Sequence, residues 1–158
     1  MDYKRYNIAA VVNDMGPSQK SFYMIKEFNK AAQNVSLSVT AFFNQTALPV
    51  TRPLFCCQNI AFFSGYHGHA ICTTLSEAEM VLKSNNNSTK YLYLWDMDWL
   101  IQPVHFMTAA NVMRDERLKI ISRSESHSQI IENFCNKSPI AIVDNWNLNQ
   151  LCEVIYAN

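Results

Sequence analysis

Short runs of apolar residues alternate along this chain with stretches whose apolar residues recur at helical spacing. The apolar runs cover residues 8–12, 36–43, 60–63, 70–73, 91–95, 118–122 and 140–143. Continuous apolar runs of this length are typical of strands that are buried on both faces. We therefore predict an α/β fold, a three-layer Rossmann-like domain with a mainly parallel sheet and helices on both faces.

The stretches with helical spacing begin after residues that commonly cap helices. They are predicted at 18–32, 74–82, 103–113, 124–135 and from Asn145 or Asn147 to Ile155. Thr74 and Ser76 each begin a capping-box pattern, with a glutamate three residues later. Residues 44–59 have no clear periodicity and are predicted as a long loop.

The composition excludes several classes of protein. A length of 158 residues fits a single domain spanning 1–158. Lys+Arg 13 balance Asp+Glu 13, so no net positive field is present to hold a nucleic acid. With only 3 glycines the chain has neither of the two glycine-rich phosphate-binding fingerprints. We therefore expect no nucleic-acid partner.

The cysteines and the first residues indicate a location. Five cysteines without a CxxC pair favour free thiols in a reducing compartment. The apolar run at 8–12 is too short for a signal peptide or a membrane span. We expect a cytoplasmic protein with no membrane partner.

Polar residues follow the predicted strands, at the end where a parallel sheet binds its ligands. These residues are Asn13, Asp14, Gly16, Asn44, Ser64, Tyr66, His67, Thr73, Thr74, Asp96, Asp98, Arg123, Ser124, Glu125, Asp144 and Asn145. Amides, hydroxyls and carboxylates match the hydroxyls of a sugar, and Tyr66, Trp95 and Trp99 offer faces for its ring. The same polar types also cap helices and form turns, which is the structural alternative.

Two aspartates form the sharpest local feature. Asp96 and Asp98 stand at i and i+2 in Trp-Asp-Met-Asp-Trp, directly after an apolar run. In an extended segment both carboxylates point to one side and could hold a divalent cation, Mg²⁺ or Mn²⁺. The DxD pattern also resembles the metal-binding motif of the A-type glycosyltransferases. The alternative is that both are helix caps or surface acids, and no cofactor is certain.

Histidines provide two weaker features. His67 and His69 supply two potential zinc ligands without a third at a fixed spacing. His127 lies in the first turn of a predicted helix, after Arg123 and Ser124, where backbone N–H groups could bind a phosphate. The same serines equally form an ordinary capped helix.

Three blocks of sequence resemble a known family. They are Val-Asn-Asp-Met-Gly-Pro-Ser at 12–18, Tyr-Leu-Trp-Asp at 93–96, and Ile-Ile-Ser-Arg-Ser-Glu-Ser-His at 120–127 followed by Ile-Val-Asp-Asn-Trp-Asn at 142–147. Their order resembles the amino-terminal Rossmann-like half of B-type glycosyltransferases and, more loosely, short phage-encoded glycosyltransferase-like proteins. This resemblance implies that Asn13, Asp14 and Gly16 lie beside the acceptor or the donor phosphate. It also implies that Arg123 and Ser124, with Glu125 next to them, face the same cleft.

The resemblance extends to one half of such an enzyme. B-type enzymes have a second Rossmann-like half, which carries most of the contacts to the nucleotide sugar. We therefore expect a glycosyltransferase-like domain that recognises a sugar or a nucleotide sugar, with a partner chain or a second copy supplying the other half for turnover. The alternative function is a non-catalytic α/β module for interaction or assembly.

Overall fold

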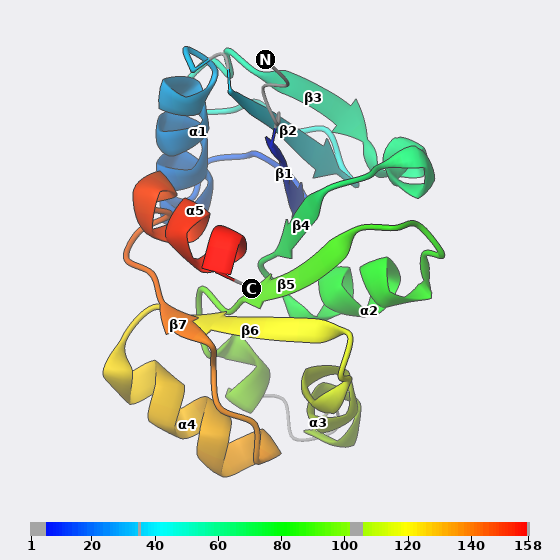
Figure 1. Cartoon of the computed structure of the whole chain (residues 1–158), viewed down its shortest axis with the longest axis vertical. Coiled ribbons are helices and arrows are strands. Elements are labelled where there is room, and N and C mark those ends of the chain that lie inside the picture. Colours follow the sequence, from blue (N-terminus) through cyan, green and yellow to red (C-terminus); the bar gives the residue numbers. More distant parts are fainter. Residues whose placement is uncertain (1–5, 35, 102–105, 158) are drawn as a thin grey trace.

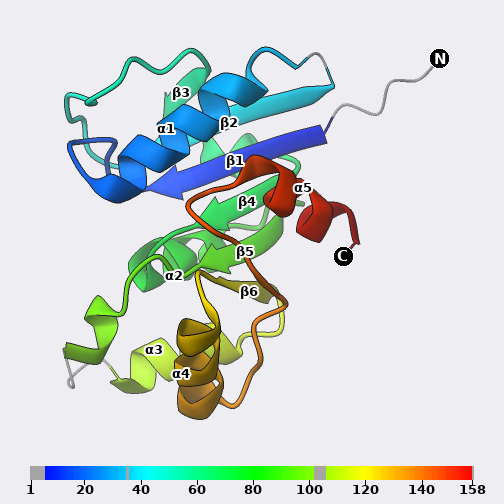
Figure 2. The same ribbon diagram turned by 90° about the vertical axis from the view of Figure 1, so that its left-hand side faces the viewer.

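The strands of the protein form one continuous parallel sheet. The computed structural model describes residues 6–34, 36–101 and 106–157. Within these residues the strand order is β3-β2-β1-β4-β5-β6-β7, and every neighbouring pair is parallel. The strands are β1 (Tyr6–Val12), β2 (Leu37–Phe43), β3 (Cys56–Asn59), β4 (His69–Cys72), β5 (Thr89–Tyr93), β6 (Leu118–Ser122) and β7 (Ala141–Ile142). Figure 2 shows them stacked in this order, from β3 and β2 at the top to β6 below.

Helices cover both faces of this sheet. They are α1 (Gln19–Ala31), α2 (Leu75–Lys83), α3 (Phe106–Arg114), α4 (Glu125–Cys135) and α5 (Leu148–Ala157). Side chains of α1 and α5 share one buried cluster with Ile8 and Tyr93, and those of α2, α3 and α4 share another with Val11 and Leu92. Figure 1 shows α1 and α5 side by side on the left of the sheet. The predicted three-layer, Rossmann-like α/β fold is therefore confirmed.

The burial of the central strand β1 accounts for its continuous apolar sequence. Ile8, Ala9, Ala10 and Val11 of β1 are all fully buried. Successive side chains of a strand point to opposite faces, so a strand covered on both faces needs apolar residues at every position. The continuous run at 8–12 meets this requirement, and β1 has a neighbouring strand on each side.

Three predicted helix starts are confirmed by their caps, whereas the start predicted at 103 lies outside the described residues. Ser18 caps α1, since its hydroxyl oxygen accepts from the backbone N–H of Ser21 at 3.0 Å. Thr74 caps α2 in a complete capping box with Glu77. Ser124 caps α4 by accepting from the backbone N–H of His127 at 3.3 Å. Each cap satisfies a backbone donor that the first helical turn leaves unpaired.

The region after β2 differs from expectation. The long loop predicted at 44–59 contains the edge strand β3 at its end, paired with β2. The apolar run at 60–63, predicted as a short strand, belongs instead to the 3₁₀ helix η1 (Ile60–Gly65). Asn59 starts that helix, because its side-chain oxygen accepts from the backbone N–H of Ala61 at 2.9 Å. The side chain of Phe63, which belongs to this 3₁₀ helix, is buried.

The turn after β7 has an unusual backbone. Asn145 and Trp146 both have positive φ, at 43° and 60°, a region that side chains other than glycine rarely adopt. Trp146 is nonetheless fully buried, with its ring edge-on to Phe28 at 5.7 Å and to Tyr93 at 5.3 Å between ring centroids. The hydroxyl of Tyr93 donates to the carbonyl of Val143 at 2.7 Å. Core packing therefore holds this turn in a strained conformation.

None of the helices in the described residues is both long enough and apolar enough to cross a bilayer.

Candidate functional site

The sheet has a topological switch point between β1 and β4. The chain leaves β1 for α1 on one face and leaves β4 for α2 on the other face. In Figure 2 the arrowheads of β1, β4 and β5 point to the left, so their carboxyl ends share one edge. In open parallel sheets ligands bind in the crevice at this edge, at the switch point.

Two adjoining pockets occupy this position. The first has a volume of about 280 Å³ and is lined by Asn13, Asp14, Ser18, Gln19, Lys20, Ser21, Trp95 and Asp96. The second, also of about 280 Å³, is lined by Lys20, Thr73, Thr74, Leu75, Leu94, Asp96 and Trp99. Because Lys20 and Asp96 line both, the two pockets form one surface, which we call the switch-point crevice. Its lining combines hydroxyls, amides, carboxylates, an ammonium group and two indole rings.

The loop after β1 fixes one carboxylate of the crevice. The Asp14 side chain accepts from the Asn13 side-chain amide at 2.9 Å and from the backbone N–H of Gly16 at 2.8 Å. A Cβ on Gly16 would lie 3.0 Å from the Asp14 carboxylate and 3.1 Å from the Cβ of Ala47. Gly16 thus allows the loop to approach the segment after β2. Asn13 and Asp14 line the crevice, whereas Gly16, whose N–H orients Asp14, is not among the described lining residues.

Arg123 supports the wall of the crevice. Its guanidinium lies 3.7 Å above the Trp95 ring and donates to the Trp95 carbonyl at 3.2 Å and to the Asn145 side-chain oxygen at 3.0 Å. Stacking and two charge-assisted hydrogen bonds hold the plane of the guanidinium in place. Through these contacts Arg123 joins Trp95 to the strained turn after β7. Among the described residues it does not line either pocket of the crevice.

The residues after Arg123 belong to the start of α4. The Ser124 hydroxyl caps the helix and lies 3.0 Å from the Ser126 hydroxyl. Glu125 is exposed in the first turn of α4. Neither Ser124 nor Glu125 is among the described residues that line the crevice. They follow the carboxyl end of β6, so they lie on the same edge of the sheet as the crevice, but β4 and β5 separate that strand from β1.

The two aspartates predicted as metal ligands are described to different extents. Asp96 lines both pockets of the crevice. The side chain of Asp98 lies outside the described residues, although its backbone begins the 3₁₀ helix η2 (Asp98–Ile101). Across the described part of the chain, no group of three or more His, Cys, Asp or Glu side chains could hold a metal ion. Metal binding therefore stays a prediction.

The predicted histidine pair lies away from the crevice. His69 begins β4 and His67 is exposed just before it, whereas the crevice follows the carboxyl end of that strand. Instead, His127 lies near the crevice, close enough to Asp96 and Arg123 for their charges to affect its pKa. Burial lowers the pKa of His127 most, Arg123 lowers it further and Asp96 opposes this.

The lowered histidine pKa values predict a dependence of stability on pH. Burial and the nearby Lys119 also lower the pKa of His69 from its usual value of 6.5. Below pH 6.5 the unfolded chain therefore binds protons that the folded protein does not. The contribution of the two histidines to stability should be complete above pH 6.5 and should decrease as the pH drops toward their folded-state pKa values.

Urea unfolding measures this effect. The urea concentration at the unfolding midpoint should decrease as the pH is lowered from about 7.5 to about 5.5. Most carboxylates titrate below this range. The double substitution His69→Gln and His127→Gln should flatten this part of the curve. An equally steep curve in the double variant would contradict the assignment to these two histidines.

Lys20 is the charged residue that sequence reasoning missed among the described residues lining the crevice; Gln19, Ser21, Leu75 and Leu94 were also missed. Its position in the first turn of α1 made it look like an ordinary polar-face residue. The first turn of a helix that follows a central strand lies at the carboxyl edge of the sheet, so this position was a usable signal. Thr73, Thr74, Trp95 and Trp99 were all recognised as rim residues and do line the crevice.

Comparison with known proteins adds no relative. No family model matches the chain, and neither the curated proteins nor the solved structures searched include a match. Any assignment of function to this chain therefore depends on its fold and on the switch-point crevice.

Proposed function

We propose that the protein is a glycosyltransferase-like domain that binds a sugar, free or as part of a nucleotide sugar, in the switch-point crevice. The observation that carries the proposal is the shared lining of the two pockets. Lys20 and Asp96 lie where the pockets join, between polar groups of the loop after β1 and those of the loop after β4.

The chemistry of the lining suits a ligand with many hydroxyls. Carboxylates such as Asp14 and Asp96 accept hydrogen bonds from hydroxyls, and the ammonium group of Lys20 donates to them. Trp95 and Trp99 provide apolar surface for the carbon face of a sugar ring. A few polar groups beside aromatic surface are the usual composition of a small-molecule site.

Transfer of the sugar is part of this proposal only together with a second Rossmann-like half. The resemblance to B-type glycosyltransferases implies that this other half binds most of the nucleotide sugar. We therefore propose that a partner chain or a second copy supplies it. We also place the protein in the cytoplasm, where its five cysteines, all free in the structure, stay reduced.

Calorimetric titration tests the binding step. The probes are glucose, galactose, mannose and N-acetylglucosamine, together with their uridine or guanosine diphosphate forms, with and without Mn²⁺. We expect at least one sugar to bind, and Asp96→Asn or Lys20→Gln to weaken it by about tenfold, since each removes a charged hydrogen-bonding partner.

A matched control separates the crevice from general effects of charge. Glu116 is exposed beside the start of β6, at the opposite edge of the sheet. Glu116→Gln should leave the affinity for every sugar unchanged. If no probe produces heat or changes the tryptophan fluorescence of the natural protein, sugar recognition in this crevice is wrong.

A further inference from the structure

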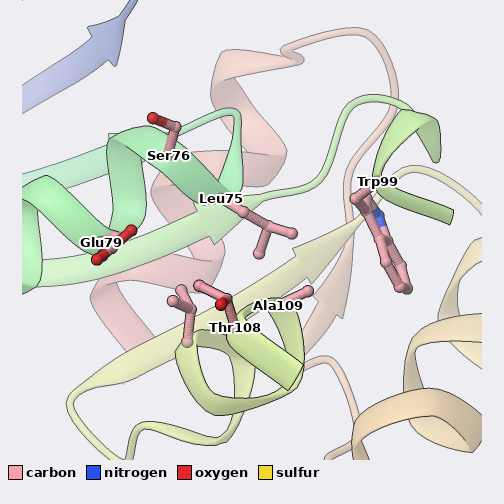
Figure 3. Close-up of a pocket in the computed structure, with 7 residues that line it drawn as sticks. Leu75, Ser76, Glu79, Trp99, Thr108 and Ala109 are labelled. Atoms are coloured by element: carbon pink, nitrogen blue, oxygen red, sulfur yellow. The ribbon is translucent and has the colours of Figure 1, made fainter. Parts of the chain in front are cut away.

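A larger pocket adjoins the switch-point crevice between α2 and α3. Its volume is about 340 Å³, and it is lined by Leu75, Ser76, Glu79, Trp99, Thr108, Ala109 and Val112. Figure 3 shows Leu75 of α2 pointing toward Thr108 and Ala109 of α3, with the Trp99 ring standing at one end. Leu75 and Trp99 also line the crevice, so one ligand can reach both spaces. We call this space the α2–α3 pocket.

The floor of the α2–α3 pocket is apolar. Ala109 and Val112 of α3 are 3% and 7% exposed, and Leu75 faces Ala109 from α2 in Figure 3. The hydroxyls of Ser76 and Thr108 belong to exposed residues at the rim. A cavity of about 150 Å³ is already large enough for a benzene ring, so a pocket of about 340 Å³ holds one with room to spare.

Trp99 forms the wall that the α2–α3 pocket shares with the crevice. Its ring is held against Phe134 of α4, with 4.5 Å between ring centroids. Its indole N–H is buried and has no hydrogen-bond partner among the described residues. The Trp99 ring, and not its N–H, therefore provides the surface that a bound molecule would contact.

The charges of the crevice disfavour an anionic ligand. Among the described residues that line the two pockets, Asp14 and Asp96 face one lysine, Lys20. At the start of α2 the buried Glu77 already accepts the backbone N–H groups of Thr73 and Thr74, at 2.9 and 3.0 Å. At the start of α2 a diphosphate would therefore meet a carboxylate where phosphate-binding folds present free N–H groups.

We propose that the natural ligand is a neutral glycoside that carries an aromatic group. The sugar occupies the switch-point crevice, and the aromatic group occupies the α2–α3 pocket, against the Trp99 ring. This inference rests on the proposed sugar binding and goes beyond it, because it selects an uncharged glycoside over a nucleotide sugar.

Matched probes test the inference by calorimetry. For each sugar that binds, the methyl glycoside, the 4-nitrophenyl glycoside and the nucleotide sugar are compared, with 4-nitrophenol as the ring alone. We expect the 4-nitrophenyl glycoside to bind at least about tenfold more tightly than the methyl glycoside, through burial of the ring. The nucleotide sugar should bind no more tightly than the methyl glycoside.

Three variants locate the gain. Ala109→Leu fills the α2–α3 pocket and should remove the advantage of the nitrophenyl group while the methyl glycoside binds as before. If overpacking prevents this variant from folding, Trp99→Phe keeps a ring in place but reduces the aromatic surface that faces the ligand, and should lower the advantage several-fold. The control is Met107→Ala, because Met107 is an exposed residue of α3 that is not among the residues lining the pocket.

The outcomes separate the two proposals. Equal affinity for methyl and 4-nitrophenyl glycosides overturns the role of the α2–α3 pocket and leaves sugar binding intact. Tighter binding of the nucleotide sugar than of the nitrophenyl glycoside overturns the preference for a neutral ligand. A third outcome is that no sugar binds, while 4-nitrophenol alone binds and this binding is lost in Ala109→Leu. That outcome overturns the proposed function and with it the assignment of a glycoside.

Discussion

Trp146→Ala should destabilise the protein by about 3–5 kcal/mol, the cost typical of truncating a large buried aromatic side chain. Trp146 is fully buried and packs edge-on against Phe28 of α1 and Tyr93 of β5. Its removal leaves a cavity where three separate parts of the chain meet. Urea unfolding followed by far-ultraviolet circular dichroism measures the change, because the substitution also removes a fluorescent ring.

Trp146→Gly is the matched control for the backbone. Both variants lose the same ring, but glycine adopts the φ of 60° found here without steric strain. The glycine variant should therefore be at least as stable as the alanine variant, although glycine is ordinarily the less stable of the two. A glycine variant that is clearly less stable than the alanine variant would show that the positive φ carries no strain.

Glu77→Ala should cost about 2–3 kcal/mol, because it removes a charged acceptor from donors that water cannot reach. The buried Glu77 carboxylate accepts from the backbone N–H of Thr73 at 2.9 Å, the Thr73 hydroxyl at 2.9 Å and the backbone N–H of Thr74 at 3.0 Å. Thr73 is only 1% exposed, so its N–H finds no replacement. The free energy of unfolding in urea gives the value directly.

Two further variants identify the cause. Glu77→Gln keeps an oxygen in the capping box and should recover at least half of the loss. Glu79→Ala removes a carboxylate from the same helix, where it pairs with Lys83 at 2.9 Å on the surface. That change should cost about 0.5 kcal/mol or less, as expected for an exposed pair. A loss at Glu79 equal to that at Glu77 would mean that helix charge, and not the buried hydrogen bonds, matters.

Most of the fold could be predicted because burial leaves a direct pattern in the sequence. β6 was predicted with its observed bounds, since Leu118, Ile120 and Ile121 are all fully buried. β3 left no such pattern, because it is a sheet edge with mostly exposed residues and exists by pairing with β2. The apolar run at 60–63 was too short to distinguish a strand from a helical turn.

The site could be predicted only in part. Strand direction alone brings Asn13, Asp14 and Asp96 to one edge, and the structure has all three around one pocket. The partners of Arg123 depend on tertiary packing against Trp95 and on a turn with positive φ that contains no glycine. Neither feature has a local sequence signal, so the role of Arg123 in supporting Trp95 could not be foreseen.

The strand order also determines when the crevice can form during folding. β1 pairs with β4, so Ile8 lies opposite His69, far along the chain. Parallel partners cannot be joined by a hairpin, and the entropy of closing such long loops must be overcome before their contacts contribute. The pairing of β1 with β4 joins the two halves of the sheet. Until β1 and β4 have paired, the chain has no crevice in which to hold a ligand.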